Sequence, residues 1–387
     1  MDSAVRALED MEGFEDLRRL RVAISHYWLV TWRGGEKVLA SMLKLFPKAD
    51  IYTLFYEPKV CGPYLKGHKV YPSAINGLRN HHQLVFPLYP YGQRSLKLKG
   101  DYDLILSSES GPAKGIANPS GIPHLCYIHT PMRYCWVDRE SYLARVPRLL
   151  RPFAELEFER LKQWDLQTVE GPDLYVANSL NVAKRVEQFY GKSANICYPP
   201  IDLGLFEAPL TQGPQDFYLS FGALTPYKRV DLLVEAFNRS GKKLKVIGDG
   251  SEMGRLRAQA QPNIQFLGAL DSVRLDQEIK GAKALLFPGD EDFGMVPLEL
   301  MARGIPVIAL AKGGALETVK QSSIGPEAST GIFYPQDNLE SLELALETFE
   351  RSCNRFNPQA IRDHARRFGE DRFLACLATQ VRALLNR

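Results

Sequence analysis

Two carboxylates flank the point where a strand is expected to end and a helix to begin. Ala284–Phe287 is an apolar run, Glu291 follows it in an acidic loop, and Glu299 falls one turn into a helix that Pro297 can start. Phe293–Met295 then lie where the first backbone N–H groups of that helix lack partners, which is a common anion site. A helix-capping role for Glu299, and loop solvation for Glu291, remain open alternatives.

Two cations form the second candidate site. Thr225 is expected to be an N-cap and Pro226 the first helical residue, which places Lys228 and Arg229 in the first turn. Positive side chains there oppose the helix dipole and cost roughly 0.3–1 kcal/mol each. A bound anion would offset this cost, and we favour that interpretation over side chains that extend into water.

The first half of the chain offers two further candidates. Gly34 and Gly35 follow the apolar run Val22–Tyr27, and paired glycines at a strand-to-helix junction let the backbone approach a ligand closely. Neither the dinucleotide fingerprint nor the P-loop spacing is present. His129 ends the run Leu125–His129, at the ligand edge of the expected sheet, although a single histidine is more often a structural hydrogen-bonding residue.

Asp101-Tyr102-Asp103 has the form of a metal-binding DxD motif. It precedes the apolar run Leu104–Ser108 and therefore lies at the amino end of a strand, whereas ligands bind at the carboxyl end. We expect a structural role for these aspartates and no metal site.

Short apolar runs alternate with helical patterns along the chain. The expected strands are Val22–Tyr27, Ile51–Phe55, Leu104–Ser108, Leu125–His129, Leu174–Ala177, Phe217–Phe221, Leu244–Ile247, Ile264–Leu267, Ala284–Phe287, Val307–Leu310 and Ile332–Tyr334. Most runs are continuous rather than alternating, which is typical of parallel strands covered on both faces. Alternation with helices predicts βαβ units, hence an α/β fold.

The length of 387 residues suggests two domains, at about 150 residues each. The best break runs from Tyr198–Asp202 through Gly213 and Pro214, because proline-rich stretches flank a polar segment there. We expect two doubly wound Rossmann-like domains, 1–203 and 204–370, that face each other across a cleft holding the site. The final helix, about 371–387, would pack back on the first domain.

Composition excludes several classes of protein. Hydrophobic residues make up 45% and charged residues 24%, which is ordinary for a globular protein, and no apolar run approaches the length of a membrane-spanning helix. Residues 1–20 lack the apolar core of a secretory signal. The six cysteines include no CxxC pair, which argues against a zinc site and fits a reducing compartment, so we expect a cytoplasmic protein.

The net charge of +3 is too small to indicate nucleic-acid binding, but its distribution is uneven. Residues 51–100 hold seven Lys and Arg against one acidic residue, Glu57, and the stretch 133–151 is also basic. Such surfaces can attract phosphates or an anionic membrane. We therefore include peripheral attachment to the inner face of the plasma membrane among the expectations. A merely solvated basic surface is the alternative.

Together, these segments resemble the retaining GT-B glycosyltransferases of the GT4 family. Glu291 and Glu299 match its E-x7-E motif, and the other matching segments are Gly248–Glu252, Gly304–Ala309 and Gly313–Glu317. In the first half, the segments that look like bacterial O-antigen and polysaccharide mannosyltransferases of that family are Trp32–Glu36, Tyr127–Tyr134, Ala177–Ser179 and Tyr198–Asp202. The resemblance covers about residues 22–385.

The resemblance implies an enzyme that moves a hexose from a nucleotide sugar to a hydroxyl of a glycan or lipid-linked acceptor in polysaccharide synthesis, with the anomeric configuration retained. Mannose and GDP-mannose are favoured. The nucleotide sugar is a co-substrate, and the family needs neither a metal nor a further cofactor. The second domain would hold the nucleotide and the first would face the acceptor.

The resemblance also implies roles for individual residues. Those assigned to catalysis are His129 and Glu291 at the donor sugar and Lys228 at the diphosphate. Those assigned to binding the nucleotide sugar are Gly34, Gly35, Lys228, Phe293, Gly294, Met295, Val296 and, at the ribose, Glu299. Arg229 joins this binding set as the second cation of the candidate turn, not through the resemblance. One position departs from the family, because Ala223 stands where an Arg often precedes the conserved lysine. The diphosphate must then be held differently, or be held more weakly.

Two other functions remain open. One is a nucleotide-sugar 2-epimerase or hydrolase on the same fold, which would turn over donor without an acceptor product. The other is a non-catalytic sugar- or lipid-binding protein that has kept the fold, an idea that Ala223 keeps open and Glu291, Glu299, Lys228 and His129 oppose.

Overall fold

The computed structural model describes residues 12–144, 146–207, 209–210 and 216–386. Contacts divide the chain into two compact units, Met1–Pro200 with Asp371–Arg387, and Ile201–Glu370. The division falls inside the predicted break Tyr198–Asp202, whereas Gly213 and Pro214 lie outside the described residues. The acceptor and nucleotide roles of the two units remain predictions.

The first unit contains a seven-stranded parallel sheet in the order β3-β2-β1-β4-β5-β6-β7. Its strands are β1 (Val22–His26), β2 (Asp50–Thr53), β3 (Val70–Pro72), β4 (Leu104–Glu109), β5 (His124–Ile128), β6 (Leu174–Ala177) and β7 (Asn195–Ile196). Five of them match predicted runs. The other two, β3 and β7, have only three and two residues, too few for a local pattern.

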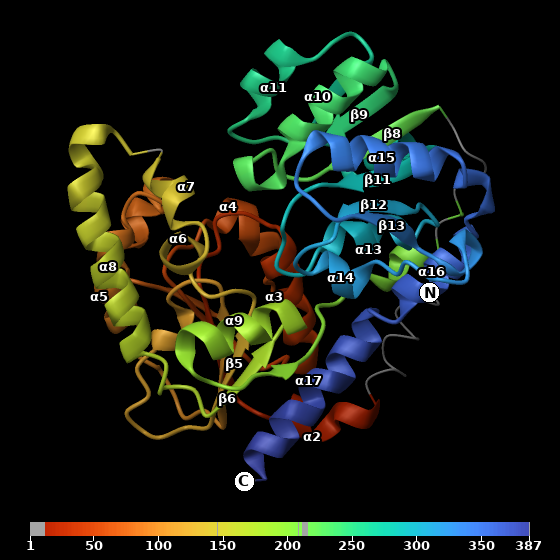
Figure 1. Ribbon diagram of the computed structural model, residues 1–387. Coiled ribbons are helices and arrows are strands. Elements are labelled where there is room, and N and C mark those ends of the chain that lie inside the picture. The colour runs from red at the N-terminus through yellow and green to blue at the C-terminus, as the bar shows by residue number, and fades with distance from the viewer. Residues whose placement is uncertain (1–11, 145, 208, 211–215, 387) are drawn as a thin grey trace. The chain divides into compact units, whose positions relative to one another are not determined.

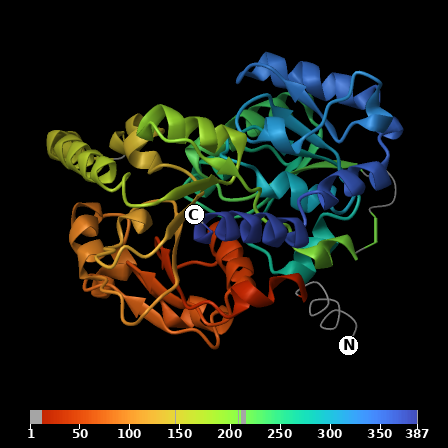
Figure 2. The same cartoon turned by 90° about the horizontal axis from the view of Figure 1, so that it is seen from below.

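Alternate strand residues of the first unit enter different cores. Val22 and Ile24 of β1 pack with helices α2, α3 and α17, whereas Ala23 faces the opposite side of the sheet. The α-helices are α2 (Glu15–Arg18), α3 (Gly34–Leu45), α4 (Pro58–Cys61), α5 (Tyr89–Ser95), α6 (Arg133–Trp136), α7 (Arg139–Leu143), α8 (Arg151–Gln167), α9 (Leu180–Tyr190) and α17 (Glu370–Leu385). Helix α17 lies beside α3 in both views (Figure 1, Figure 2). Burial on both faces explains the continuous apolar runs.

Six short 3-10 helices lie among the described residues of the first unit. They are η1 (Glu12–Phe14), η2 (Gly62–Tyr64), η3 (Asn76–His81), η4 (Phe86–Leu88), η5 (Ala113–Gly115) and η6 (Arg148–Leu150).

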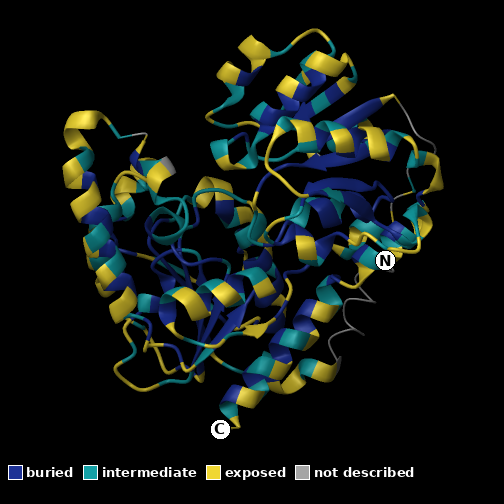
Figure 3. Ribbon diagram, viewed as in Figure 1, coloured by how far each residue is buried: buried dark blue, intermediate teal, exposed yellow. Residues whose placement is uncertain are grey.

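The second unit contains a six-stranded parallel sheet in the order β10-β9-β8-β11-β12-β13. Its strands are β8 (Phe217–Phe221), β9 (Lys243–Ile247), β10 (Ile264–Gly268), β11 (Ala282–Phe287), β12 (Val307–Leu310) and β13 (Gly331–Tyr334), and all six were predicted. Figure 3 shows the strands buried beneath helices whose outer surfaces are exposed. The predicted α/β class with two doubly wound parallel sheets is confirmed.

The helices of the second unit cover both faces of its sheet. They are α10 (Val230–Ser240), α11 (Met253–Gln259), α12 (Ser272–Glu278), α13 (Met295–Met301), α14 (Ala315–Thr318), α15 (Leu339–Glu350) and α16 (Pro358–Arg366), with short η7 (Leu203–Phe206), η8 (Pro226–Lys228), η9 (Pro326–Ala328) and η10 (Cys353–Arg355). The apolar face predicted for α10 is buried at Val230, Leu233, Val234 and Phe237. In the described chain, every helix is too short or too polar to cross a membrane.

Candidate functional site

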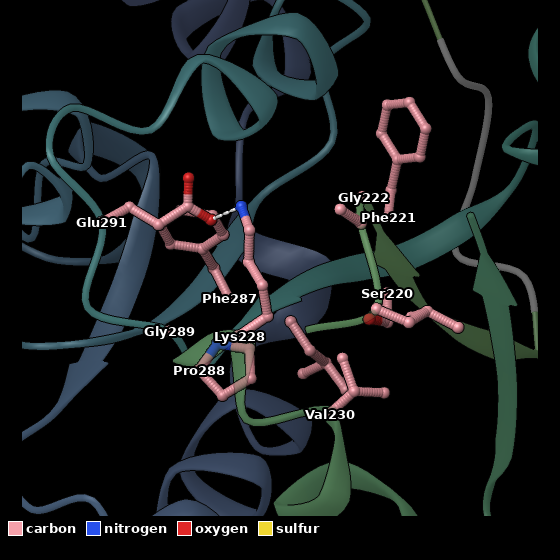
Figure 4. A pocket seen from close by; sticks show the side chains of 12 residues that line it. Ser220, Phe221, Gly222, Lys228, Val230, Phe287, Pro288, Gly289 and Glu291 are labelled. Carbon is pink, nitrogen blue, oxygen red and sulfur yellow. Dashed lines mark hydrogen bonds and ion pairs between the residues drawn. The ribbon is translucent and has the colours of Figure 1, made fainter. Parts of the chain in front are cut away.

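The strand order of each unit has one switch point. In the second unit it lies between β8 and β11, because β9 and β10 follow on one side and β12 and β13 on the other. A recess opens there (Figure 4). It is lined by Ser220–Leu224, Lys228, Val230, Leu286–Gly289 and Glu291. Both loops leave the carboxyl ends of their strands, the edge where ligands bind in this fold.

Lys228 and Glu291 meet inside this recess. In Figure 4 the two side chains point toward one another, and Lys228 Nζ donates to Glu291 Oε1. Their side chains are only 16% and 15% exposed, so both charges are partly removed from water. Nζ also lies 5.5 Å from the ring centroid of Tyr227 and 6.0 Å from that of Phe287. Two residues 63 positions apart thus place opposite charges in one recess.

Glycines allow the loop that carries Glu291 to pack closely against its two neighbouring loops. A Cβ on Gly289 would lie 3.0 Å from the backbone oxygen of Tyr227 and 3.1 Å from Cα of Lys228. Gly314 N donates to the carbonyl of Glu291 at 2.8 Å, and a Cβ on Gly314 would lie 2.2 Å from the carbonyl oxygen of Phe293. Larger residues at these positions would push the Glu291 loop away. Sequence reasoning noted Gly314 only as part of a resemblance and did not assign it this role.

Ala223, the departure from the family pattern, lines the same recess. Backbone bonds hold its segment, since Gly222 N donates to the carbonyl of Ile247 at 3.0 Å and Leu224 N to that of Asp249 at 2.9 Å. The missing arginine therefore concerns the recess that contains Lys228 and Glu291.

The predicted helical setting is correct in part for Lys228, which ends a 3-10 turn that starts at Pro226, and wrong for Arg229. Thr225 precedes the 3-10 turn Pro226–Lys228 without a side-chain capping bond, and α10 begins only at Val230. Arg229 lies between the 3-10 turn and α10, and its φ of +52, in the left-handed region, separates the two helical segments. The dipole argument for an anion at both cations therefore fails.

Arg229 has partners of its own. Its guanidinium bonds to Asp337 and lies 3.3 Å from Asp231, and Arg229 does not line the described recess. Two carboxylates thus balance its charge. Its role in phosphate binding remains a prediction, and Lys228 is the cation that the recess contains.

The segment Phe293–Glu299 has the predicted strand–loop–helix form. Helix α13 begins at Met295 after Gly294, whose φ is +91, and Val296 follows Met295. Phe293 is buried, with its ring centroid 5.8 Å from that of Phe368.

Glu299 is the fifth residue of α13, beyond the N3 position of a capping box, so that alternative is removed. None of Phe293–Val296 and Glu299 lines the described recess, and their nucleotide-binding roles remain predictions.

In the first unit, Gly34 and Gly35 open α3 as predicted. A Cβ on Gly35 would lie 2.2 Å from the Tyr27 hydroxyl, so close packing within the protein already requires glycine there. Glu36 caps the helix by accepting from Arg33 N at 2.9 Å. Burial raises the pKa of Glu36 above its ordinary value. A ligand role for the two glycines stays a prediction.

His129 follows β5 directly, at the predicted edge of the sheet. Its Nε2 lies 2.9 Å from Ser108 Oγ, which lies 3.0 Å from His26 Nδ1. Burial lowers the pKa of His26 well below its ordinary value. Sequence reasoning missed Ser108 and His26. Their position at the ends of β4 and β1, the switch point of this sheet, was the available signal.

Two residues of the DxD-like segment, Tyr102 and Asp103, have structural partners. Asp103 Oδ2 accepts from Arg21 N at 2.8 Å, and Tyr102 donates to Asp50 Oδ2 at 2.7 Å. Among the residues that the structure describes, no group of three or more His, Cys, Asp or Glu side chains could hold a metal ion.

Residues 205–367 match the profile of the family described as glycosyl transferases group 1. This segment contains all six strands of the second unit and the whole recess at its switch point. The resemblance to glycosyltransferases that the motifs indicated is therefore borne out over residues 205–367.

Mannosyltransferases are among the relatives of this chain. Alpha-1,3/1,6-mannosyltransferase ALG2 of Saccharomyces cerevisiae is 25% identical over 262 residues, which cover 54% of this chain and 51% of that protein. The chain thus spans about half the length of that relative. O-antigen chain mannosyltransferase C of Escherichia coli is 22% identical over 389 residues, covering 93% of this chain and 96% of that protein.

A solved structure shares the fold. The structure of Anabaena Alr3699/HepE in complex with UDP-glucose has a TM-score of 0.68 and 15% identity, and the match covers 94% of this chain and 100% of that one. This likeness confirms the predicted GT-B fold class.

Proposed function

We propose that this protein is a retaining glycosyltransferase that moves mannose from GDP-mannose to a hydroxyl of a glycan or lipid-linked acceptor in polysaccharide synthesis. The recess at the β8–β11 switch point carries the proposal. It joins a lysine and a glutamate, Lys228 and Glu291, within the segment that matches group 1 glycosyltransferases.

The two charges of the recess suit the two parts of a nucleotide sugar. Lys228 binds the diphosphate, and Glu291, released from its ion pair as the phosphate takes the lysine, accepts from hydroxyls of the donor sugar. By the family resemblance, Glu299 binds the ribose, while the backbone of Phe293–Val296 and of Gly34 and Gly35 meets the phosphates. His129 approaches the sugar.

Catalysis then depends on charge and position. Negative charge grows on the leaving diphosphate, and a preorganised cation such as Lys228 stabilises it in the transition state. Holding the acceptor hydroxyl beside the anomeric carbon supplies much of the remaining acceleration. In the front-face mechanism usual for retaining members of the family, the departing phosphate takes the acceptor proton, so no general base is assigned.

Mannose is supported by the match to O-antigen chain mannosyltransferase C over 93% of the chain. UDP sugars are the main alternative to GDP-mannose as the donor, because the structure of HepE was solved with UDP-glucose. A thermal-shift panel of GDP-, UDP-, dTDP- and ADP-sugars tests the proposal, since the ligand that binds the folded state best raises the melting temperature most. A panel without any shift, or donor turnover without an acceptor product, would contradict it.

Transfer should survive EDTA. Asp103 accepts a hydrogen bond from Arg21 N at the amino end of β4, away from the edge of the sheet where ligands bind. Lys228 supplies positive charge at the recess. The rate of product formation with and without chelator is the measurement. A loss of transfer that added Mg²⁺ or Mn²⁺ restores would overturn metal-independent transfer.

The acceptor side includes an anionic membrane surface in this proposal. In η6 and the first turns of α8, four apolar residues are between 50% and 96% exposed and follow exposed Arg148: Leu149, Leu150, Phe153 and Leu156. Apolar side chains rimmed by cations suit the boundary between lipid headgroups and acyl chains. Lys97 and Lys99, also exposed, add charge to this unit.

Vesicle binding separates the two contributions. Reversing Lys97 and Lys99 to Glu should weaken binding to vesicles that contain anionic lipid, and the effect should fade at high salt because the charges are screened. Replacing Leu149 and Phe153 by Ser should weaken binding at any salt concentration. Leu344→Ser, at a residue 63% exposed in the second unit, is the matched control. Equal binding by all variants would remove the membrane from the proposal.

A further inference from the structure

Three polar side chains continue one buried face of the sheet in the first unit. His26 ends β1, Ser108 lies near the end of β4, and His129 follows β5. Each stands two positions after a residue of the core beneath α3 and α17, namely Ile24, Leu106 and Tyr127. Because side chains alternate along a strand, the three lie on the same face. Strands β1, β4 and β5 are neighbours, which brings the three together.

The Ser108 hydroxyl connects the two histidine rings. Its Oγ lies 3.0 Å from His26 Nδ1 and 2.9 Å from His129 Nε2, and the Ser108 side chain is fully buried. A hydroxyl has one proton and can also accept. Ser108 therefore donates to one ring and accepts from the other.

His26 decides the direction of this relay. The residue is 1% exposed, and its Nε2 has no hydrogen-bond partner in the described structure. A buried N–H without an acceptor is rarer than an acceptor without a donor, so Nε2 is the unprotonated nitrogen. Burial also keeps this ring neutral, because it lowers the pKa of His26. The single ring proton is then on Nδ1, and His26 donates to Ser108.

We propose that Ser108 and His26 are positioning residues for His129. The Ser108 proton points to Nε2 of His129 and fixes that ring as the neutral tautomer with its proton on Nδ1. The N–H on Nδ1 of His129 is then a donor of the kind that an oxygen of a sugar or phosphate accepts. The use of this donor in transfer rests on the proposed function, whereas the tautomer does not.

The main chain of His129 is held independently of its ring. His129 N donates to the carbonyl of Glu109 at 2.7 Å, and Asn178 Nδ2 donates to the His129 carbonyl at 3.0 Å. The rings of Tyr27 and Tyr127 lie edge-on, with centroids 6.2 and 5.2 Å from that of His129. These contacts place the residue, and the bond from Ser108 selects the ring nitrogen that carries the proton.

Nitrogen-15 NMR of the histidine side chains reads the tautomer directly. The wild-type protein should show His129 protonated on Nδ1, and Ser108→Ala should move the proton toward Nε2. Ser107→Ala is the matched control, because Ser107 is equally buried on the same strand and bonds another histidine, His124. It should leave His129 unchanged. His129→Gln assigns the signal.

The wild-type spectrum alone can overturn the inference. A His129 ring protonated on Nε2, or charged near neutral pH, would contradict it without any variant. An unchanged tautomer in folded Ser108→Ala would contradict it as well. Ser108→Thr, which restores the hydroxyl, should return the proton to Nδ1.

A binding measurement separates this inference from the proposed function. Calorimetry should be carried out with GDP-mannose and with GDP. Ser108→Ala should lower the affinity for GDP-mannose by about 2- to 10-fold, the range expected for one hydrogen bond, and leave the affinity for GDP unchanged. Ser107→Ala should weaken neither. If the tautomer shifts as expected while the affinity for GDP-mannose stays unchanged, the positioning role stands and the contact between His129 and the donor sugar is refuted.

Discussion

The carboxyl ends of β1 and β4 in the first unit, and of β8 and β11 in the second, occupy the same place in two sheets of like strand order. Their chemistry differs. The first switch point holds a neutral relay through Ser108, buried to 0–1% exposure at Ser108 and His26. The second holds the ion pair of Lys228 and Glu291, with each side chain about one-sixth exposed.

Solvent access explains this difference. A buried charge must be paired and hydrogen-bonded to offset its loss of hydration, and a fully buried group is more readily kept neutral. The half-open recess of the second unit can keep charges and exchange the partner of Lys228 for a phosphate. The buried part of the first switch point, at His26 and Ser108, orders a proton without carrying a charge. Strand topology thus locates both places, and burial decides which chemistry each can perform.

The largest expected effect is at the charged switch point. Lys228→Ala should weaken binding of the best nucleotide sugar by roughly 10- to 150-fold, because a hydrogen bond to a charged group contributes about 1.5–3 kcal/mol. Lys245→Ala is the matched control, since Lys245 pairs with Glu278 at 2.8 Å in the same unit outside the recess. Calorimetry measures both. Equal losses in the two variants would show that the recess is not special.

Glu299 tests how far the charged site extends beyond the recess. Glu299→Gln should weaken donor binding by about tenfold, because an amide replaces a carboxylate that can accept from two ribose hydroxyls. Donor affinity and melting temperature should be measured together. A lower melting temperature with unchanged affinity would assign Glu299 a purely structural role in α13.

Ala223 offers a gain rather than a loss. Ala223→Arg adds a fork-shaped donor to a residue that lines the recess, and it should tighten donor binding by about 2- to 10-fold. It should also partly restore binding to Lys228→Ala. Abolished binding in a folded variant would mean that another group fills the space beside Ala223.

The smallest effect is expected in the first unit and concerns its free energy of unfolding at acidic pH. Burial lowers the pKa of His124 to about 4, below the 6.5 or so of an unfolded chain. As the pH falls from 7 to 5.5, the unfolded chain binds a proton that the folded one does not, which should cost the wild type about 1 kcal/mol.

Comparison with His124→Gln isolates this contribution. The variant lacks the titrating group. The difference in free energy of unfolding between wild type and variant should therefore be about 1 kcal/mol smaller at pH 5.5 than at pH 7. Glu109 acts with the opposite sign, because burial raises its pKa to about 7, but it is present in both proteins and cancels. Urea unfolding of the first unit at both pH values measures the difference. A difference between the two proteins that is the same at both pH values would contradict a neutral, buried His124.

The sequence by itself determined the strands and the main candidates. Continuous apolar runs reflect burial on both faces, a local property, so every strand of four or more residues was predictable. The position of Glu291, Glu299 and His129 after such runs placed them at the ligand edge of a parallel sheet. Residue type and position along the chain were enough for these assignments.

Only the tertiary structure decided which of these residues meet. Ser108 joins His26 and His129 across 82 and 21 positions, and Arg229 finds Asp337 across 108. Such pairs depend on strand order and loop approach, which are set by the packing of whole elements and leave no mark in the local pattern. For the same reason, the sequence indicated two neighbouring cations at 228 and 229, and the fold placed one in the recess and bound the other to carboxylates.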